Sequence, residues 1–213
     1  MLEGLLPLSG YVRFFVTLTA VLDPFLAVPI FLALTAARGV EERRALVRIV
    51  TITVFSVLAV SALVGEQLLL LVGASLSAFR VGGGLVLLMM ALAMLNAQAG
   101  GVRQSQDEAK ELQSGELSGV VPLAVPLLAG PGAISTTIIA AQAGGAAHIG
   151  AILACILLVC ALTWTTLKLA GPIGATMGAT GLNIATRLLG LLLAALAIQT
   201  MAEGLRQLFP GLA

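Results

Sequence analysis

The stretch LDPFLAVPIF, residues 22–31, places one carboxylate and two prolines inside an apolar region. Proline interrupts a helix because it lacks the backbone N–H, but it fits well at the first position of a helix. We therefore expect Pro24 to begin a half-helix. Two roles fit Asp23: a structural N-cap, or a group that binds a coupling proton or cation or orients a substrate ammonium. Asp23, Pro24 and Pro29 are candidate substrate-binding residues, and Asp23 is a candidate for coupling.

A second stretch, PLLAGPGAIST at residues 126–136, has Gly-Pro-Gly in the middle of an apolar run. Pro131 is expected to begin another half-helix, whose free N–H groups and positive dipole end favour a carboxylate or another anion. Three small hydroxyl side chains follow, and each can contact either a ligand or a neighbouring helix. The candidate substrate-binding residues of this stretch and its continuation are Gly130, Pro131, Gly132, Ser135, Thr136 and Thr137.

Two arginines, Arg80 and Arg187, stand near the starts of two later apolar runs. They can act in coupling or gating by pairing with Asp23 or with a substrate carboxylate, or they can simply extend to the membrane surface from a helix end. The single histidine, His148, gives no metal site and is assigned no role. The sequence has no nucleophile–base pair, no H-E-x-x-H motif and no ATP-hydrolysis motif. We therefore expect no enzymatic activity, no metal and no cofactor, with coupling to H⁺ or Na⁺ left open.

The composition indicates that the elements carrying these residues lie in lipid. Of 213 residues, 59% are hydrophobic and 10% are charged, and the mean hydropathy is +1.09. A soluble domain is about half apolar and about a quarter charged. The 11 basic and 10 acidic residues are spread in small groups, so nothing indicates nucleic acid. The sequence predicts an integral membrane protein whose surroundings are the lipid bilayer.

A helix of about 20 apolar residues crosses a bilayer. Six such spans are expected, at residues 9–35, 46–68, 77–97, 118–142, 147–169 and 183–205. A polar linker at residues 98–117 separates a first three-span repeat, residues 1–97, from a second, residues 118–213, within one membrane domain.

The two halves have matching anchor residues. A shift of 107 residues places Pro24 on Pro131 and Arg80 on Arg187. Three spans are an odd number, so the second repeat enters the membrane from the opposite side, as in many secondary transporters. The sequence therefore predicts an all-α membrane protein of six transmembrane helices. These form two inverted three-helix repeats, with the first and fourth spans broken into half-helices.

The basic residues collect on one side of this topology. With both termini outside, the cytoplasmic loops hold Arg38, Arg43, Arg44, Arg48, Arg103, Lys110, Lys168 and Arg187. The outer side then holds only Arg13, Arg80 and Arg206. The positive-inside rule therefore predicts a multi-pass protein of the cell (inner) membrane with both termini outside and the linker in the cytoplasm.

Four segments resemble the MarC family of bacterial and archaeal membrane proteins: LDPFLAVPIF, FRVGGGLVLLMMALAML, PLAVPLLAGPGAIST and ATRLLGLLLAALAIQTMAEGL. The likeness covers nearly the whole chain, and PLLAGPGAI is a specific signature. The family is similar to six-span neutral amino acid transporters, which implies a secondary transporter coupled to an ion or a proton. One departure concerns the first motif, commonly Asp-Pro-x-Gly-Asn-x-Pro. Here Leu26 and Ala27 replace Gly and Asn, which removes a polar side chain from the first break.

The leading expectation is transport of a small solute, a neutral amino acid such as glycine or alanine. It would proceed by alternating access around a midplane site between the two broken helices. Two alternatives stay open: a membrane structural or assembly protein without transport activity, and an exporter of another small metabolite. The sequence is also compatible with a homo-oligomer.

Overall fold

A computed structural model describes residues 7–36, 38–96, 128–142 and 144–212, and within these ranges the chain is helical with no strand. The predicted linker, residues 98–117, lies outside the described residues, as does most of the first half of the predicted span 118–142. The helices in chain order are α1 (Leu8–Leu22), α2 (Pro24–Leu34), α3 (Val40–Val72), α4 (Leu76–Leu95), α7 (Pro131–Ala141), α8 (Ala146–Lys168) and α9 (Ala170–Leu208), followed by the short 3-10 helix η3 (Pro210–Leu212).

Five helical segments of the described part are long and apolar enough to cross a membrane, with α1 and the start of α2 counted together as Leu8–Leu32. The shorter apolar helix α7 has 11 residues. Large apolar side chains point outward along these helices; for example, Leu157 is 57% exposed and Leu188 is 64% exposed. Such surfaces are stable in lipid and costly in water. The protein is therefore a multi-pass integral membrane protein.

The observed helices agree with most of the predicted spans. The predicted spans 9–35, 77–97 and 147–169 correspond to α1 with α2, to α4 and to α8. Span 46–68 was predicted too short, because α3 already begins at Val40. Its polar first turns are stabilised as helix, since Glu41 favours the positive end of the helix dipole and pairs with Arg44 at 2.8 Å.

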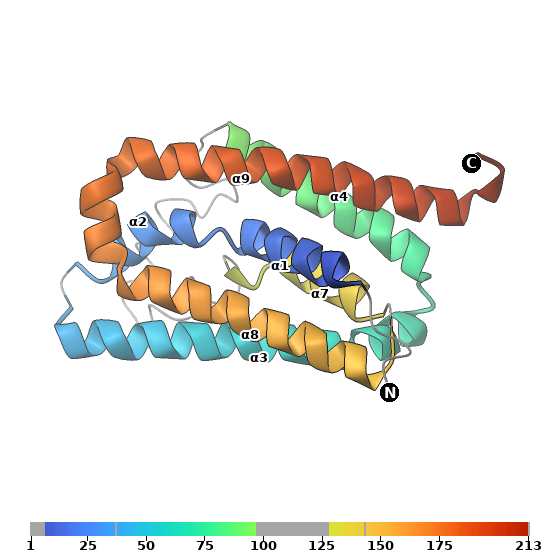
Figure 1. Cartoon of the computed structure of the whole chain (residues 1–213), viewed down its shortest axis with the longest axis horizontal. Coiled ribbons are helices and arrows are strands. Elements are labelled where there is room, and N and C mark those ends of the chain that lie inside the picture. Colours follow the sequence, from blue (N-terminus) through green and yellow to red (C-terminus); the bar gives the residue numbers. More distant parts are fainter. Residues whose placement is uncertain (1–6, 37, 97–127, 143, 213) are drawn as a thin grey trace.

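The last predicted span, 183–205, is only part of α9. This helix extends from Ala170 to Leu208 and is kinked at Gly178, where φ is 59° and ψ is −177°. A positive φ is accessible to glycine without the steric penalty that a Cβ imposes. The kink turns the chain between α8 and the long part of α9, as Figure 1 shows at the end of the molecule opposite the termini.

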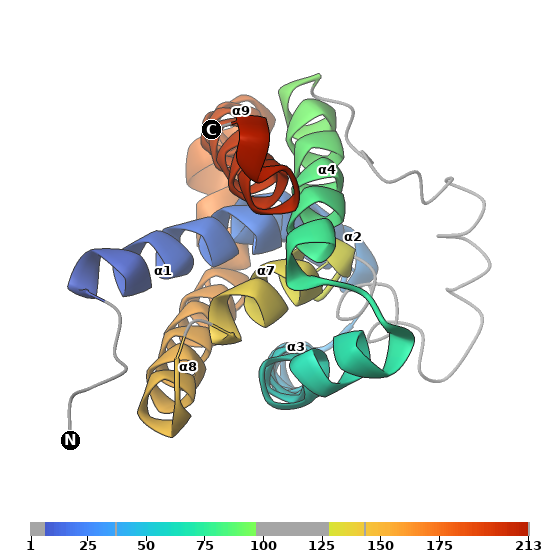
Figure 2. The same cartoon turned by 90° about the vertical axis from the view of Figure 1, so that its right-hand side faces the viewer.

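The helices form three layers. The pair α4 and α9 lies on one side, the pair α3 and α8 on the other, and α1, α2 and α7 lie between them (Figures 1 and 2). In the apolar 18-residue stretch of Leu8–Leu32, 56% of the residues are accordingly buried, against 28–33% in those of the other four long segments. The interrupted helices thus occupy the protein interior, which is where irregular backbone can be satisfied at membrane depth.

Glycines allow α4 and α9 to approach each other closely. A Cβ added at Gly190 would lie 2.8 Å from Cβ of Met94, and one at Gly84 would collide with the side chain of Met201. Small residues at helix contacts serve this purpose in membrane proteins. The contact joins the last helix of each half of the chain along much of its length.

The two ends of the molecule differ in charge. The start of α1 and the end of α9 lie at the same end in Figure 1, and the start of α3 and the end of α8 lie at the other. That other end carries the basic residues of α3, namely Arg43, Arg44 and Arg48, together with Lys168. This distribution is the one used to predict that the termini lie outside, and the orientation itself stays a prediction.

Candidate functional site

The first helix break lies at Asp23. Helix α1 ends at Leu22, Asp23 takes a left-handed conformation with φ 37° and ψ 72°, and α2 begins at Pro24. Such a φ is uncommon for a residue other than glycine, and Asp is among the residues that tolerate it best. Oδ1 of Asp23 accepts a hydrogen bond of 3.2 Å from the N–H of Leu26. The predicted break and the predicted N-cap are therefore both confirmed.

The other oxygen of this carboxylate is not satisfied in the same way. Asp23 is only 2% exposed, and its Oδ2 has no hydrogen-bond partner among the described residues. The side chain of Thr186, on α9, lies near the carboxyl group of Asp23. One turn earlier, Oγ1 of Thr19 is likewise buried without a partner. Buried polar atoms are normally paired, so these atoms need an explanation.

The second break differs from the first in how its helix begins. Gly130 is the N-cap residue and α7 begins at Pro131, with no side chain capping the helix. The N–H groups of a helix's first turn, here those of the buried Gly132 and Ala133, have no acceptor within the helix. Because Asp23 already occupies the start of α2, the start of α7 is the better place for an external anion.

The two breaks are in contact. A Cβ added at Gly132 would lie 2.6 Å from Sδ of Met90 and 3.4 Å from Cγ1 of Val21. Val21 lies just before the first break, and Met90 is on α4. The start of α7 thus packs directly against the end of α1, at a place with no room for a side chain.

Two threonines after the second break lack the hydrogen bond from side chain to backbone that many other hydroxyls make. Many other serine and threonine side chains of the described residues donate to the carbonyl four residues earlier, as Ser135 does to Pro131 at 2.6 Å. Thr136 is 8% exposed and Thr137 is fully buried, yet their Oγ1 atoms have no partner within the described ranges. Both hydroxyls are free to bond a ligand.

The remaining predicted site residues are more dispersed. Pro24 is buried at the start of α2, whereas Pro29 lies inside α2 and is exposed. Arg80 is partly buried and its Nε has no partner among the residues that the structure describes, and Arg187 is exposed on α9. Neither arginine forms an ion pair with Asp23 in the described part of the chain.

Pro131 faces a separate, mostly apolar groove. This groove of about 780 Å³ lies between α4 and the start of α7, and its lining includes Gly130, Pro131 and Ser135. The second break is thus bordered on this side by α4 and on the other side by the end of α1.

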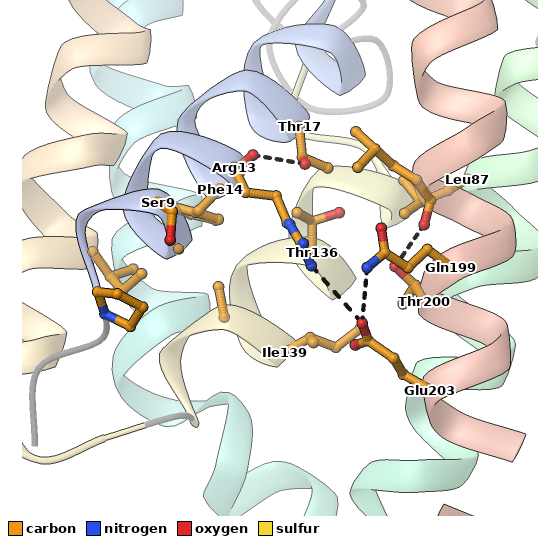
Figure 3. Close-up of a pocket in the computed structure, with 15 residues that line it drawn as sticks. Ser9, Arg13, Phe14, Thr17, Leu87, Thr136, Ile139, Gln199, Thr200 and Glu203 are labelled. Carbon is orange, nitrogen blue, oxygen red and sulfur yellow. Dashed lines mark hydrogen bonds and ion pairs between the residues drawn. The ribbon is translucent and has the colours of Figure 1, made fainter. Parts of the chain in front are cut away.

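A cavity of about 420 Å³ lies between α1, α7 and α9 (Figure 3). Thr136 lines it, together with one basic and one acidic side chain, Arg13 and Glu203. Nη1 of Arg13 lies 3.8 Å from Oε1 of Glu203, which also accepts a hydrogen bond of 3.1 Å from Nε2 of Gln199. This group has no signal in the sequence, because Arg13 and Glu203 lie near opposite ends of the chain and no motif spacing relates them.

His148 has a structural position that its sequence context did not indicate. It is fully buried in the first turn of α8, with Nδ1 2.8 Å from the Tyr11 hydroxyl and Nε2 2.8 Å from the Ala140 carbonyl. A carbonyl only accepts, so Nε2 carries a proton, and in the neutral ring Nδ1 accepts from Tyr11. His148 therefore joins α8 to α1 and α7 beside the cavity.

Interior half-helices with unpartnered polar atoms, enclosed by long apolar helices, define a class of polytopic membrane proteins built around interrupted helices. The sequence profile of the MarC family integral membrane proteins matches residues 8–209. The chain belongs to this family.

Its relatives come from bacteria and archaea. The chain is 32% identical to the UPF0056 membrane protein YhcE of Escherichia coli K12, covering 100% of this chain and 99% of that protein. It is 36% identical to the UPF0056 membrane protein YvbG of Bacillus subtilis, covering 95% of this chain and 97% of that protein. It is 34% identical to the UPF0056 membrane protein MJ1677 of Methanocaldococcus jannaschii, covering 93% of this chain and 97% of that protein. No solved structure matches the chain at a significant level.

Proposed function

We propose that this protein is a secondary transporter of a small zwitterion, namely a neutral amino acid such as glycine or alanine. The observation that carries the proposal is a set of buried polar atoms at the helix breaks that have no partner among the described residues: Oδ2 of Asp23 and Oγ1 of Thr136 and Thr137. Unsatisfied polar atoms are costly in a membrane interior, so their presence at both breaks favours a polar ligand there.

The chemistry of the two breaks matches the two ends of an amino acid. In this proposal the substrate carboxylate binds the first-turn N–H groups of α7, at Gly132 and Ala133, where no side chain caps the helix. The substrate ammonium then faces the free oxygen of Asp23. The hydroxyls of Thr136 and Thr137 supply further hydrogen bonds. A coupling proton or Na⁺ would bind at Asp23 in the same cycle.

Alternating access requires two parts that move against each other, and in this proposal they are two inverted repeats. Under the 107-residue shift, Met94 corresponds to Met201. Met94 packs on Gly190, and Met201 packs on Gly84, which is next to Gly83, the counterpart of Gly190. These nearly reciprocal contacts support the proposed repeat. Rocking of one repeat against the other around the breaks would expose the site to each side in turn. The source of energy would be an ion gradient or the substrate's own gradient.

The proposal is tested with purified protein in liposomes and labelled glycine, alanine and serine. We expect saturable uptake by the wild type and its loss in Gly132→Leu, because the side chain would displace Met90 and Val21. Gly150→Leu on α8 is the matched control, since a Cβ there meets nothing within 4 Å. It should transport normally.

Absence of uptake by the wild type, together with no thermal shift in the presence of any neutral amino acid, would refute the proposal. A structural or assembly role would then be favoured. Equal transport by both leucine variants would remove the breaks from the substrate path.

A further inference from the structure

The cavity between α1, α7 and α9 has balanced charges on opposite walls. Among the described residues that line it, Arg13 on α1 and Glu203 on α9 are the charged ones. The other polar lining consists of hydroxyls and one amide: Ser9, Thr17, Thr136, Gln199 and Thr200. Its volume of about 420 Å³ lies within the usual range for small-molecule sites.

The ion pair across the cavity is weakly held. Its N–O distance of 3.8 Å is long, and the side chains of Arg13 and Glu203 are 59% and 48% exposed. Exposed ion pairs of this kind contribute little to stability. Figure 3 shows both side chains reaching toward each other from α1 and α9, so a ligand that separates this pair would meet both charges.

We infer that this cavity is a recognition site for zwitterions, in which Arg13 binds the ligand's carboxylate and Glu203 binds its ammonium. The two charges select a ligand of zero net charge, because a simple anion or cation would leave one wall charge without a partner. Apolar side chains, among them Phe14, Leu87 and Ile139, favour a small uncharged side group.

The cavity also leads toward the proposed transport site. Thr136 lines it and lies one turn after Gly132, at the second break. A zwitterion released by Arg13 and Glu203 would therefore find the free hydroxyl of Thr136 next. The inference rests on the proposed function for the class of substrate, but it assigns recognition of the zwitterion to Arg13 and Glu203 and not to the residues of the helix breaks.

The test measures glycine uptake in liposomes, with acetate and methylammonium as singly charged competitors. In Arg13→Gln and Glu203→Gln we expect KM for glycine to rise roughly tenfold, with the maximal rate within about twofold of wild type. Acetate should not compete in the wild type but should compete in Glu203→Gln, whose cavity is left positive. Methylammonium should compete in Arg13→Gln by the same reasoning. Arg206→Gln, in the last turn of α9 and outside the cavity, is the control and should behave as wild type.

The outcomes separate this inference from the proposed function. No saturable uptake by the wild type refutes the proposed function. Wild-type uptake with an unchanged KM and unchanged competitor preference in both neutral variants overturns the recognition site alone. If a neutral variant fails to assemble, Glu203→Asp and Arg13→Lys keep the charges but alter their reach. An unchanged KM in both of these overturns the inference equally.

Discussion

The substitution Gly132→Ala tests how tightly the two helix breaks are packed. The added Cβ would lie 2.6 Å from Sδ of Met90, 3.2 Å from Cδ2 of Leu87 and 3.4 Å from Cγ1 of Val21. The distance to Val21 is an ordinary contact and the one to Leu87 requires a shift of a few tenths of an ångström, so the clash is concentrated on Met90. One methyl group therefore has to displace either that side chain or the start of α7.

The cost follows from the flexibility of the side chain that must move. Overpacking a well-packed interior costs about 1–3 kcal/mol. Methionine is unbranched and adapts readily, which places this substitution in the lower part of that range, at about 1–2 kcal/mol. For a chain of this length the loss corresponds to roughly 2–8 °C in the unfolding temperature.

The assay is SDS-induced and thermal unfolding of purified protein, followed by circular dichroism. Gly150→Ala is the control and should not destabilise, since its Cβ has open space. In the double variant Gly132→Ala/Met90→Ala the clash is gone, so the two changes should couple favourably by about 1 kcal/mol. Two results would refute the close packing of α7 on α4: Gly132→Ala as stable as the wild type, or a double variant whose stability change equals the sum of the two single changes.

Three further substitutions test single side chains. Asp23→Asn keeps an acceptor for the N–H of Leu26, so stability should stay within about 1 kcal/mol of wild type while the pH dependence of glycine uptake changes; an identical pH profile would leave Asp23 as a cap only. Thr137→Val removes a buried, unpartnered hydroxyl, so the variant should be as stable as wild type or more stable by about 1 kcal/mol, with weaker glycine uptake; a clear destabilisation in SDS unfolding would mean that the hydroxyl has a partner. His148→Phe removes the contacts to the Tyr11 hydroxyl and the Ala140 carbonyl and should cost about 2–3 kcal/mol in the same assay; a loss below that of an exposed control such as Leu157→Ala would show that His148 does not join the helices.

Much of the fold could be predicted because the relevant signals are local. Long apolar runs separated by polar residues give membrane spans, and three predicted spans match observed helices within a few residues. Helix ends were less predictable. The charged first turns of α3 look like a loop in hydropathy, but they are helical, with Glu41 at the positive end of the helix dipole.

The candidate site was predictable only in part. Proline and its neighbours restrict their own backbone, so the breaks at Asp23 and at Gly130–Pro131 are visible in the sequence. The exposure of Pro29 and of Arg187 could not be foreseen, because it depends on which face of a helix meets the neighbouring helices.

The sequence by itself determined the membrane class, the position of the first helix interruption with its cap, and the start of α7 at Pro131. These follow from hydropathy and from the geometry of proline, which act over a few residues. Only the tertiary structure decided that the breaks touch at Gly132, that His148 is buried, and that Arg13 and Glu203 share a cavity. These features depend on side chains from distant helices, and their burial, pairing and spacing exist only after the helices have packed.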